Sequence, residues 1–302
     1  MPSMFQNVIF KMLTAGLCLC LPIAAAAEPA YRVDPGFPQL PAGLQLAAVA
    51  GVAVDSKGQI LAFHRAEPPI VVLDAGGKWL RSFGGGLFKS AHGLRVDRDD
   101  NVWVTDNANH TVIKLNPEGR VLLTLGERDV AGADESHFNK PTDVAFAANG
   151  DFFIADGYGN SRVVKFDAGG KFLKAWGRKG NAEGEFNLPH AVRLDSKGRV
   201  YVGDRENNRV QVFDQEGRFL RQFGGFAPYG LFITPEDVLF VADGRGNKVL
   251  KMTLEGKLLA EWGTRGTEPG RFTMPHDVAV GADGAVYVGE IGGKRLQKFV
   301  PR

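Results

Sequence analysis

Three histidines recur at one fixed point of an internal repeat in this 302-residue chain. The imidazoles fall on units two, four and six of six. If the units close into a ring, alternate units lie a third of a turn apart, and the three side chains converge on one axis. Three neutral imidazoles hold a zinc-sized ion at about 2.0–2.1 Å with one position open, which is typical of a catalytic metal site. The residues at the repeated point are, in order, Ala50, His92, Thr142, His190, Tyr229 and His276.

The units that would position these histidines are each predicted to be four short antiparallel strands. An apolar alternation such as 278–280 meets an Asp-Gly turn, and a second strand such as 200–204 ends on an acidic residue. Asn-rich and Gly-containing turns, which supply the positive φ that hairpins need, separate two further strands. The acidic position recurs roughly every 40–50 residues, a spacing typical of propellers. An all-β, six-bladed β-propeller is therefore expected. The residues at that position are His64, Asp106, Asp156, Asp204, Asp243 and Glu290.

The ring needs a closing strand, because the last unit stops after three strands, at Phe299 near Arg302. A segment from the N-terminal side, about Leu44 to Val49, is predicted to supply the fourth strand. Closure of this kind leaves no long open sheet edge. The propeller domain is thus expected to span residues 44–302.

The N-terminus, residues 1–27, is expected to be a cleaved signal peptide. Lys11 precedes an apolar run that ends in alanines up to Ala27, the small residues that a signal peptidase needs. The run is shorter than the roughly 20 apolar residues of a membrane span, and a retained anchor is the alternative. A leader, residues 28–43, would follow in an exported protein, periplasmic or secreted. Both cysteines of the chain, Cys18 and Cys20, lie in the signal segment.

Composition narrows the class of partner. The net charge of +2 is close to neutral, and lysine and arginine are spread evenly, so no nucleic acid is expected. A hydrophobic content of 44% with 39 glycines suits an all-β protein with many turns. No membrane attachment is expected after signal cleavage.

The chain resembles two nested families. Its units are similar to NHL repeats, a family of six-bladed β-propellers. From about Gly51 to the end it also resembles peptidyl-α-hydroxyglycine α-amidating lyase, because a specific set of His, Tyr and Arg motifs occurs in the order seen in that family. The motifs are Phe63-His64-Arg65, His92-Gly93-Leu94, Asp156-Gly157-Tyr158-Gly159-Asn160-Ser161-Arg162, Leu188-Pro189-His190, Asp204-Arg205-Glu206-Asn207 and Met274-Pro275-His276-Asp277.

The resemblance implies a metal-dependent lyase that cleaves the C–N bond of an N-acyl-α-hydroxyglycine to an amide and glyoxylate. It implies that zinc is held by the three repeated histidines, that Tyr158 is the general base, and that Arg205 lies beside it. Arg65 would hold the substrate carboxylate or support the tyrosine, and Met274 would line the substrate channel. The alternative for Tyr158 is a structural role as an aromatic residue in a turn. The alternative for Arg205 and Arg65 is that both are ordinary surface charges.

The resemblance also implies a structural calcium ion. Its ligands would be the Asp277 carboxylate and the backbone carbonyls of Val52 and Leu94, since calcium prefers hard oxygen ligands. The alternative for Asp277 is an ordinary strand-start turn like Asp143. One departure is Gly159, where secreted animal members have a cysteine beside the tyrosine.

The substrate and its source stay open. A small-molecule or peptide substrate with an α-hydroxyglycine-like end is expected, supplied by a separate hydroxylating enzyme. Two other classes of function fit a propeller: a calcium-dependent lactonase or esterase, and a non-catalytic NHL scaffold that binds protein or glycan. Metal content separates them, because zinc favours the lyase, calcium alone favours the hydrolase, and no metal favours the scaffold.

Overall fold

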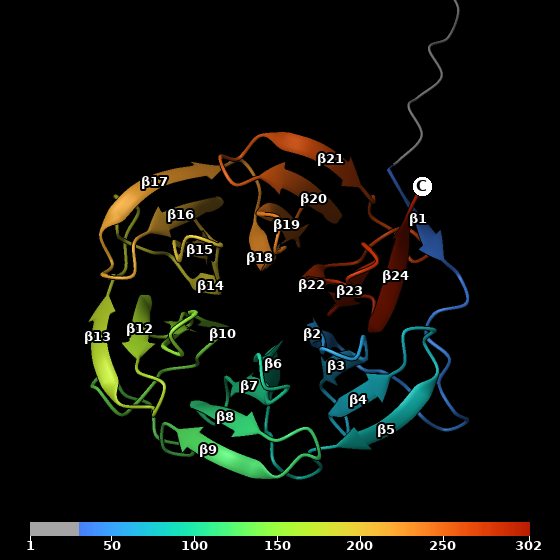
Figure 1. Ribbon diagram of the computed structural model, residues 1–302, viewed down its shortest axis with the longest axis horizontal. Helices are drawn as coiled ribbons and strands as arrows, with labels where there is room; N and C mark the ends of the chain where they lie inside the picture. The colour runs from blue at the N-terminus through green and yellow to red at the C-terminus, as the bar shows by residue number, and fades with distance from the viewer. Residues whose placement is uncertain (1–29) are drawn as a thin grey trace, which may run out of the picture.

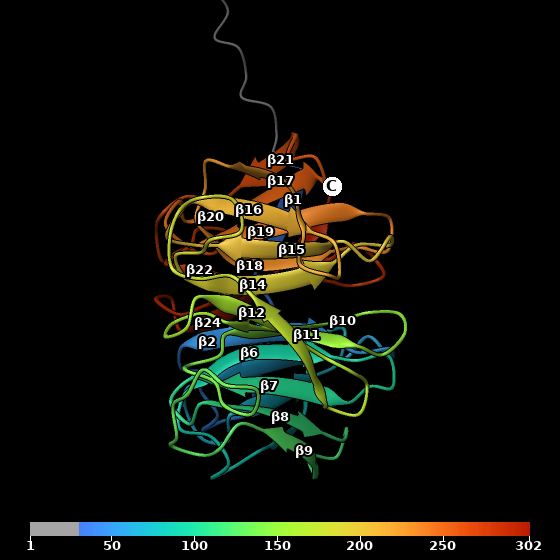
Figure 2. The ribbon, with the colours of Figure 1, turned by 90° about the vertical axis from the view of Figure 1, so that its left-hand side faces the viewer.

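The computed structural model describes residues 30–302, and in that range it contains only β-strands and the loops between them. The strands form six four-stranded antiparallel sheets, the blades, around a central axis (Figure 1). From the side, the ring is a disc whose blades lie face to face (Figure 2). The expected all-β, six-bladed propeller is confirmed.

In each blade the first strand lies at the axis and the last at the perimeter (Figure 1). Blade one is β2 (Val49–Val54), β3 (Ile60–His64), β4 (Ile70–Leu73) and β5 (Trp79–Phe83), and blade two is β6 (Ala91–Val96), β7 (Val102–Asp106), β8 (Thr111–Leu115) and β9 (Val121–Leu125). Blade three is β10 (Asp143–Phe146), β11 (Phe152–Asp156), β12 (Arg162–Phe166) and β13 (Phe172–Trp176), and blade four is β14 (Pro189–Leu194), β15 (Val200–Asp204), β16 (Arg209–Phe213) and β17 (Phe219–Gly224). Blade five is β18 (Pro228–Ile233), β19 (Val238–Asp243), β20 (Lys248–Thr253) and β21 (Leu258–Trp262), and blade six is β22 (Pro275–Val280), β23 (Val286–Glu290), β24 (Arg295–Pro301) and β1 (Tyr31–Asp34).

The hydrophobic core is divided into six clusters, one between each pair of neighbouring blades. Phe63 and Ile70 of blade one, for example, pack with Leu94 and Val104 of blade two, and another cluster joins blade six back to blade one. The second strand of a blade is therefore buried on both faces, whereas perimeter strands such as β13 alternate between half-buried and exposed positions. Full burial of a Phe or Leu side chain contributes about 1.5–3 kcal/mol, so the inter-blade clusters hold the ring together.

Ring closure differs from the prediction in which segment provides it. The fourth strand of blade six is β1, which pairs antiparallel with β24 from Tyr31↔Pro301 to Asp34↔Lys298. The Tyr31 ring stacks on Trp262 of blade five at 4.3 Å between centroids. The prediction of 44–49 as this strand, and hence of residue 44 as the domain boundary, was wrong.

The reason is distance. Residues 44–48 lead directly into β2 at the axis. The perimeter of a four-stranded blade lies three strand spacings away, roughly 14 Å, so this segment cannot serve both places. Leu44 and Leu46 instead pack against the cluster between blades six and one. The expected leader, residues 28–43, therefore contributes a strand to the propeller.

The acidic position at the end of each second strand closes the loop that precedes the blade's first strand. Asp204, for example, accepts the Asn187 N–H at 2.7 Å and pairs with the Arg209 guanidinium at 2.8 Å. In blade one the acceptor is the Nδ1 atom of His64, 3.2 Å from the Ala47 amide nitrogen. His64 is fully buried, so a neutral imidazole replaces the carboxylate there.

Two predictions concern the N-terminus and the membrane. The predicted signal peptide, residues 1–27, lies outside the described residues. Within residues 30–302, no helix is long and apolar enough to cross a bilayer.

Candidate metal centre and active site

A β-bulge turns each of the three histidines toward the axis. The register of the first strand with the second shifts between Ala91 and Leu94, between Pro189 and Ala191, and between Pro275 and Asp277. A bulge leaves a residue unpaired and re-aims its side chain. The repeated position of the sequence is thus the position at which the inner strand departs from regular pairing.

The three imidazoles come together as predicted. Their ring centroids are 4.7 Å apart for His92 and His190, 4.9 Å for His92 and His276, and 4.8 Å for His190 and His276. One ring nitrogen from each lies within 4.8 Å of the others. All three side chains are buried.

The three blades whose residue at the repeated position is not histidine orient the three axial histidines. The Nδ1 atom of His92 lies 2.8 Å from the Thr142 carbonyl, that of His190 lies 2.5 Å from the Tyr229 carbonyl, and that of His276 lies 2.7 Å from the Ala50 carbonyl. A carbonyl only accepts, so each Nδ1 carries the proton and each Nε2 keeps a free lone pair. The six residues of the repeated position therefore act as three pairs, each joining one blade to the next.

Burial keeps the imidazoles neutral. Desolvation lowers the pKa of His92 and His190 well below 6.5 and that of His276 to about 3, and the positive charge of neighbouring groups adds to the effect. Neutral imidazole is the form that binds a metal. In the described structure His276 Nε2 is buried without a hydrogen-bond partner, a costly state that a bound cation would remove. Donor type, protonation and geometry fit a divalent ion.

Tyr158 lies over this triad. It follows the second strand of blade three, and its hydroxyl oxygen is 3.2 Å from His92 Nε2 and 3.3 Å from His190 Nε2. The residue is 37% exposed, so the hydroxyl sits between the buried imidazoles and the solvent. The predicted general base is therefore placed at the mouth of the metal centre.

Arg205 touches the Tyr158 hydroxyl, as predicted. Its Nη1 atom donates to that oxygen at 3.3 Å. The guanidinium also lies 4.6 Å from the ring centroid of Tyr229 and 5.4 Å from that of Tyr158, distances of cation–π contacts. Its Nε atom donates to Glu206 at 2.9 Å. Sequence reasoning missed Tyr229 and Glu206 as contacts of the arginine, although Tyr229 stands at the repeated position.

Arg65 and Met274 lie at the rim. The Arg65 Nε donates to the carbonyl of Ala91, the residue before His92, at 3.1 Å. Its positive charge acts on His92 and His276, and it lines a hollow of about 140 Å³ with Lys89. Among the described residues, the Tyr158 hydroxyl forms hydrogen bonds with residues other than Arg65, so Arg65 does not hold the tyrosine directly. The Met274 side chain is 41% exposed.

The oxygen groups expected to bind calcium do lie close together, but they surround the Arg95 side chain. Arg95 Nη1 lies 2.5 Å from Asp277 Oδ2, 2.5 Å from the Leu94 carbonyl and 3.4 Å from the Val52 carbonyl. The residues present therefore do not fit a calcium ion at this point, because a guanidinium already occupies it. Asp277 and Asp143 are both buried partners of Arg95, so neither is a simple strand-start turn.

Known proteins share the repeat and much of the sequence of this chain. A family model described as NHL repeat matches residues 88–115, 138–166 and 186–213. Peptidyl-glycine alpha-amidating monooxygenase B of Xenopus laevis is 35% identical over 300 aligned positions, which cover 85% of this chain and 34% of that protein. A probable peptidyl-alpha-hydroxyglycine alpha-amidating lyase of Caenorhabditis elegans is 32% identical over 290 positions, covering 83% of this chain and 82% of that protein. The chain belongs to the peptidyl-α-hydroxyglycine α-amidating lyase family.

This family membership makes the protein an enzyme of the lyase class. The chain spans about a third of the length of the frog relative, 34%, but most of the length of the nematode lyase. A solved streptogramin B lyase structure has a TM-score of 0.66 and covers 90% of this chain and 98% of its own, at 16% identity. At that identity the likeness shows the propeller fold alone, so the assignment to the amidating lyase family rests on the sequence relatives.

Proposed function

We propose that the protein cleaves the C–N bond of an N-acyl-α-hydroxyglycine, releasing an amide and glyoxylate. The observation that carries the proposal is the Tyr158 hydroxyl, which contacts two imidazoles of the triad and the Arg205 guanidinium at once. A general base must lie within hydrogen-bond reach of the proton it removes. A substrate hydroxyl directed at the triad would meet that condition.

The metal centre is proposed to hold zinc through His92, His190 and His276. When bound, the ion supplies Lewis-acid chemistry that polarises a substrate oxygen. The carbonyls of Thr142, Tyr229 and Ala50 fix the imidazoles in the tautomer that leaves each Nε2 free for it.

The proton transfers fall to Tyr158. As its phenolate it takes the proton of the substrate hydroxyl, the oxygen's electron pair forms the aldehyde C=O of glyoxylate, and the C–N bond breaks. The same proton then passes to the departing amide nitrogen, so no other reactant is needed. Arg205 donates to the phenolic oxygen and stabilises its negative form by a charge-assisted hydrogen bond.

The rim is proposed to recognise the rest of the substrate. Arg65 presents positive charge to the carboxylate of the hydroxyglycine end, and Met274 lines the channel. A separate enzyme would make the hydroxylated substrate. We also propose that residues 1–27 direct export to the periplasm or the exterior.

The other two classes of function are less well supported. A calcium-dependent lactonase would use carboxylate and amide ligands on the axis, whereas the described axis presents three imidazoles and a carboxylate pair already neutralised by arginine. A binding scaffold has no use for a tyrosine held against two imidazoles of a buried histidine triad.

Glyoxylate release from a simple N-acyl-α-hydroxyglycine tests the proposal. The wild-type protein with zinc should release amide and glyoxylate in equal amounts. Tyr158→Phe removes one oxygen and should lower kcat by about 10²–10⁴, with an unchanged melting curve and metal content. Wild-type turnover by the phenylalanine variant would exclude Tyr158 as the base.

A further inference from the structure

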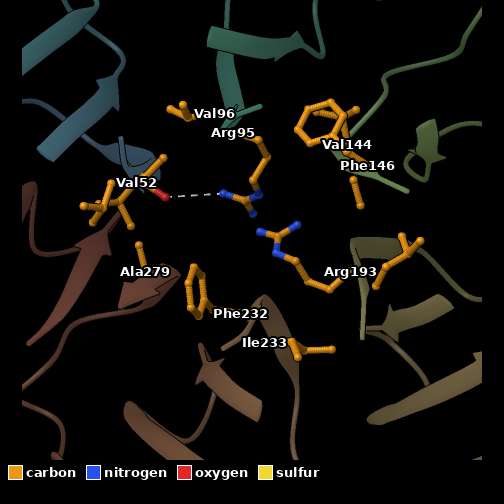
Figure 3. Close-up of a pocket in the computed structure, with 13 residues that line it drawn as sticks. Val52, Arg95, Val96, Val144, Phe146, Arg193, Phe232, Ile233 and Ala279 are labelled. Atoms are coloured by element: carbon orange, nitrogen blue, oxygen red, sulfur yellow. Dashed lines mark hydrogen bonds between the residues drawn. The ribbon is translucent and has the colours of Figure 1, made fainter. Parts of the chain in front are cut away.

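Two arginines and two aspartates form a buried cluster on the axis, below the histidines. Arg95 lies between Asp277 of blade six and Asp143 of blade three, with side chains 11%, 3% and 2% exposed. The Arg193 guanidinium binds Asp143 at 2.7 Å. Both guanidiniums point toward the centre of the ring (Figure 3). Both arginines line a cavity of about 200 Å³.

Arg95 contacts each of the oxygen groups expected to bind calcium, and Asp143 as well. Its Nη1 donates to Asp277 Oδ2 and to the Leu94 and Val52 carbonyls. The contact with Val52 is the dashed line in Figure 3. Its Nη2 donates to Asp277 Oδ1 at 3.0 Å and to Asp143 Oδ2 at 3.1 Å. One planar fork thus collects ligands from blades one, two, three and six.

The charge balance also argues against an additional ion. Two guanidiniums already neutralise the two carboxylates, so a divalent cation would add two positive charges to a neutral buried cluster. Calcium needs six to eight oxygen ligands, and the carboxylate oxygens here are engaged by arginine. The Val52 amide also donates to Asp277 Oδ2 at 2.9 Å.

We propose that Arg95 takes the place of a central metal ion, so that the propeller is closed at this level by the chain's own guanidinium and needs no calcium. Arg95 would then be a positioning residue for the metal centre above it. It fixes Asp277, which adjoins His276, and Asp143, which adjoins Thr142, the residue whose carbonyl orients His92. The proposal does not depend on the reaction, because melting temperature and metal content test it.

The wild-type protein gives the first test. After removal of metals and reloading with zinc, millimolar calcium should leave Tm unchanged, and elemental analysis should find no bound calcium. A stoichiometric calcium ion, or a Tm that rises with calcium, would overturn the proposal.

The second test opens the site. Arg95→Ala leaves the buried Asp277 carboxylate without its guanidinium partner and leaves Asp143 with Arg193 alone. The variant should lower Tm by roughly 10 °C, and calcium, but not the same concentration of magnesium, should restore much of that loss. Adding Asp277→Asn should abolish the rescue. Arg98→Ala, which removes an exposed arginine of the following turn, is the matched control and should change neither Tm nor its response to calcium.

Zinc affinity separates positioning from mere stability. Measured well below Tm, where circular dichroism shows a folded ring, Arg95→Ala should bind zinc at least tenfold more weakly than wild type, and calcium should restore the affinity. Unchanged zinc affinity would refute the positioning role, and absence of calcium rescue would refute the equivalence of guanidinium and ion. If the alanine variant does not fold, Arg95→Lys with the same measurements and the wild-type calcium test still decide the matter.

Discussion

Arg205 Nη1 lies 3.3 Å from the Tyr158 hydroxyl oxygen, and the two side chains reach this contact from neighbouring blades. The arginine follows the second strand of blade four and the tyrosine that of blade three. A hydrogen bond to a charged group contributes about 1.5–3 kcal/mol. A contact of this strength is enough to change the rate of a reaction in which Tyr158 is the proposed base.

Replacing Arg205 should slow the chemical step. Arg205→Ala should lower kcat by about 10- to 100-fold, because the phenolate loses its donor, while the metal content stays that of wild type. Arg205→Lys should recover only part of the loss, since lysine cannot present the planar fork. Steady-state kinetics with a hydroxyglycine substrate measure both, and an alanine variant at the wild-type rate would show that the contact has no catalytic role.

Metal binding should couple to the stability of the ring. An ion bound only by the closed propeller stabilises it by about 2.7 kcal/mol at a hundredfold excess over Kd, so a chelator should lower Tm by roughly 5–10 °C. His190→Ala should lose the ion and the chelator response. His137→Ala is the control, because that histidine pairs with Asp134 and Glu127. Retention of full metal content by the His190 variant would contradict the axial site.

His64 should make the metal-free protein sensitive to acid. Burial lowers its pKa below 6.5, so the unfolded chain binds its proton at a higher pH than the folded one. Its stabilising contribution is therefore present above the unfolded pKa and is lost as the pH falls below about 6.5. Protonation also removes the Nδ1 acceptor of the Ala47 amide.

The substitution His64→Asp tests this, because it installs the carboxylate that blades two to five use at the same position. Relative to wild type, the metal-free variant should gain stability steadily from pH 7 to pH 5. Urea unfolding at several pH values measures the difference. A constant difference over that range would show that His64 does not titrate on unfolding.

Export predicts a defined new N-terminus. Cleavage should fall near Ala27, where the small residues of the signal end, and the mature chain would still contain Tyr31 and the closing strand. N-terminal sequencing of protein from the periplasm or medium checks the site. An intact Met1 on soluble cytoplasmic protein would exclude export by cleavage.

The sequence predicted the parts of this molecule that repeat. Strand pairs, turns and the position of His92, His190 and His276 follow from one pattern written six times. The closing strand was misplaced because Tyr31–Asp34 is four residues long and lies outside the repeat, so no neighbouring unit indicates its partner.

The central arginine cluster escaped prediction for a different reason. Arg95 and Arg193 stand three residues after His92 and His190, a correspondence visible in the sequence. Whether such side chains reach water or turn to the axis depends on the packing of four blades, and an arginine in a strand is ordinarily a surface residue. The repeat placed Tyr229 at a position equivalent to the histidines, but it did not reveal the contact of Tyr229 with Arg205.

Closure of the ring by β1 and β24 also dictates when the metal centre can exist. Blade six takes strands from both ends of the chain, and its histidine is oriented by the Ala50 carbonyl of blade one. A ribosome-bound or truncated chain that lacks blade six offers two imidazoles and no third. A site of three imidazoles therefore exists only in the finished ring, and an ion bound there would report that every blade has been made and joined.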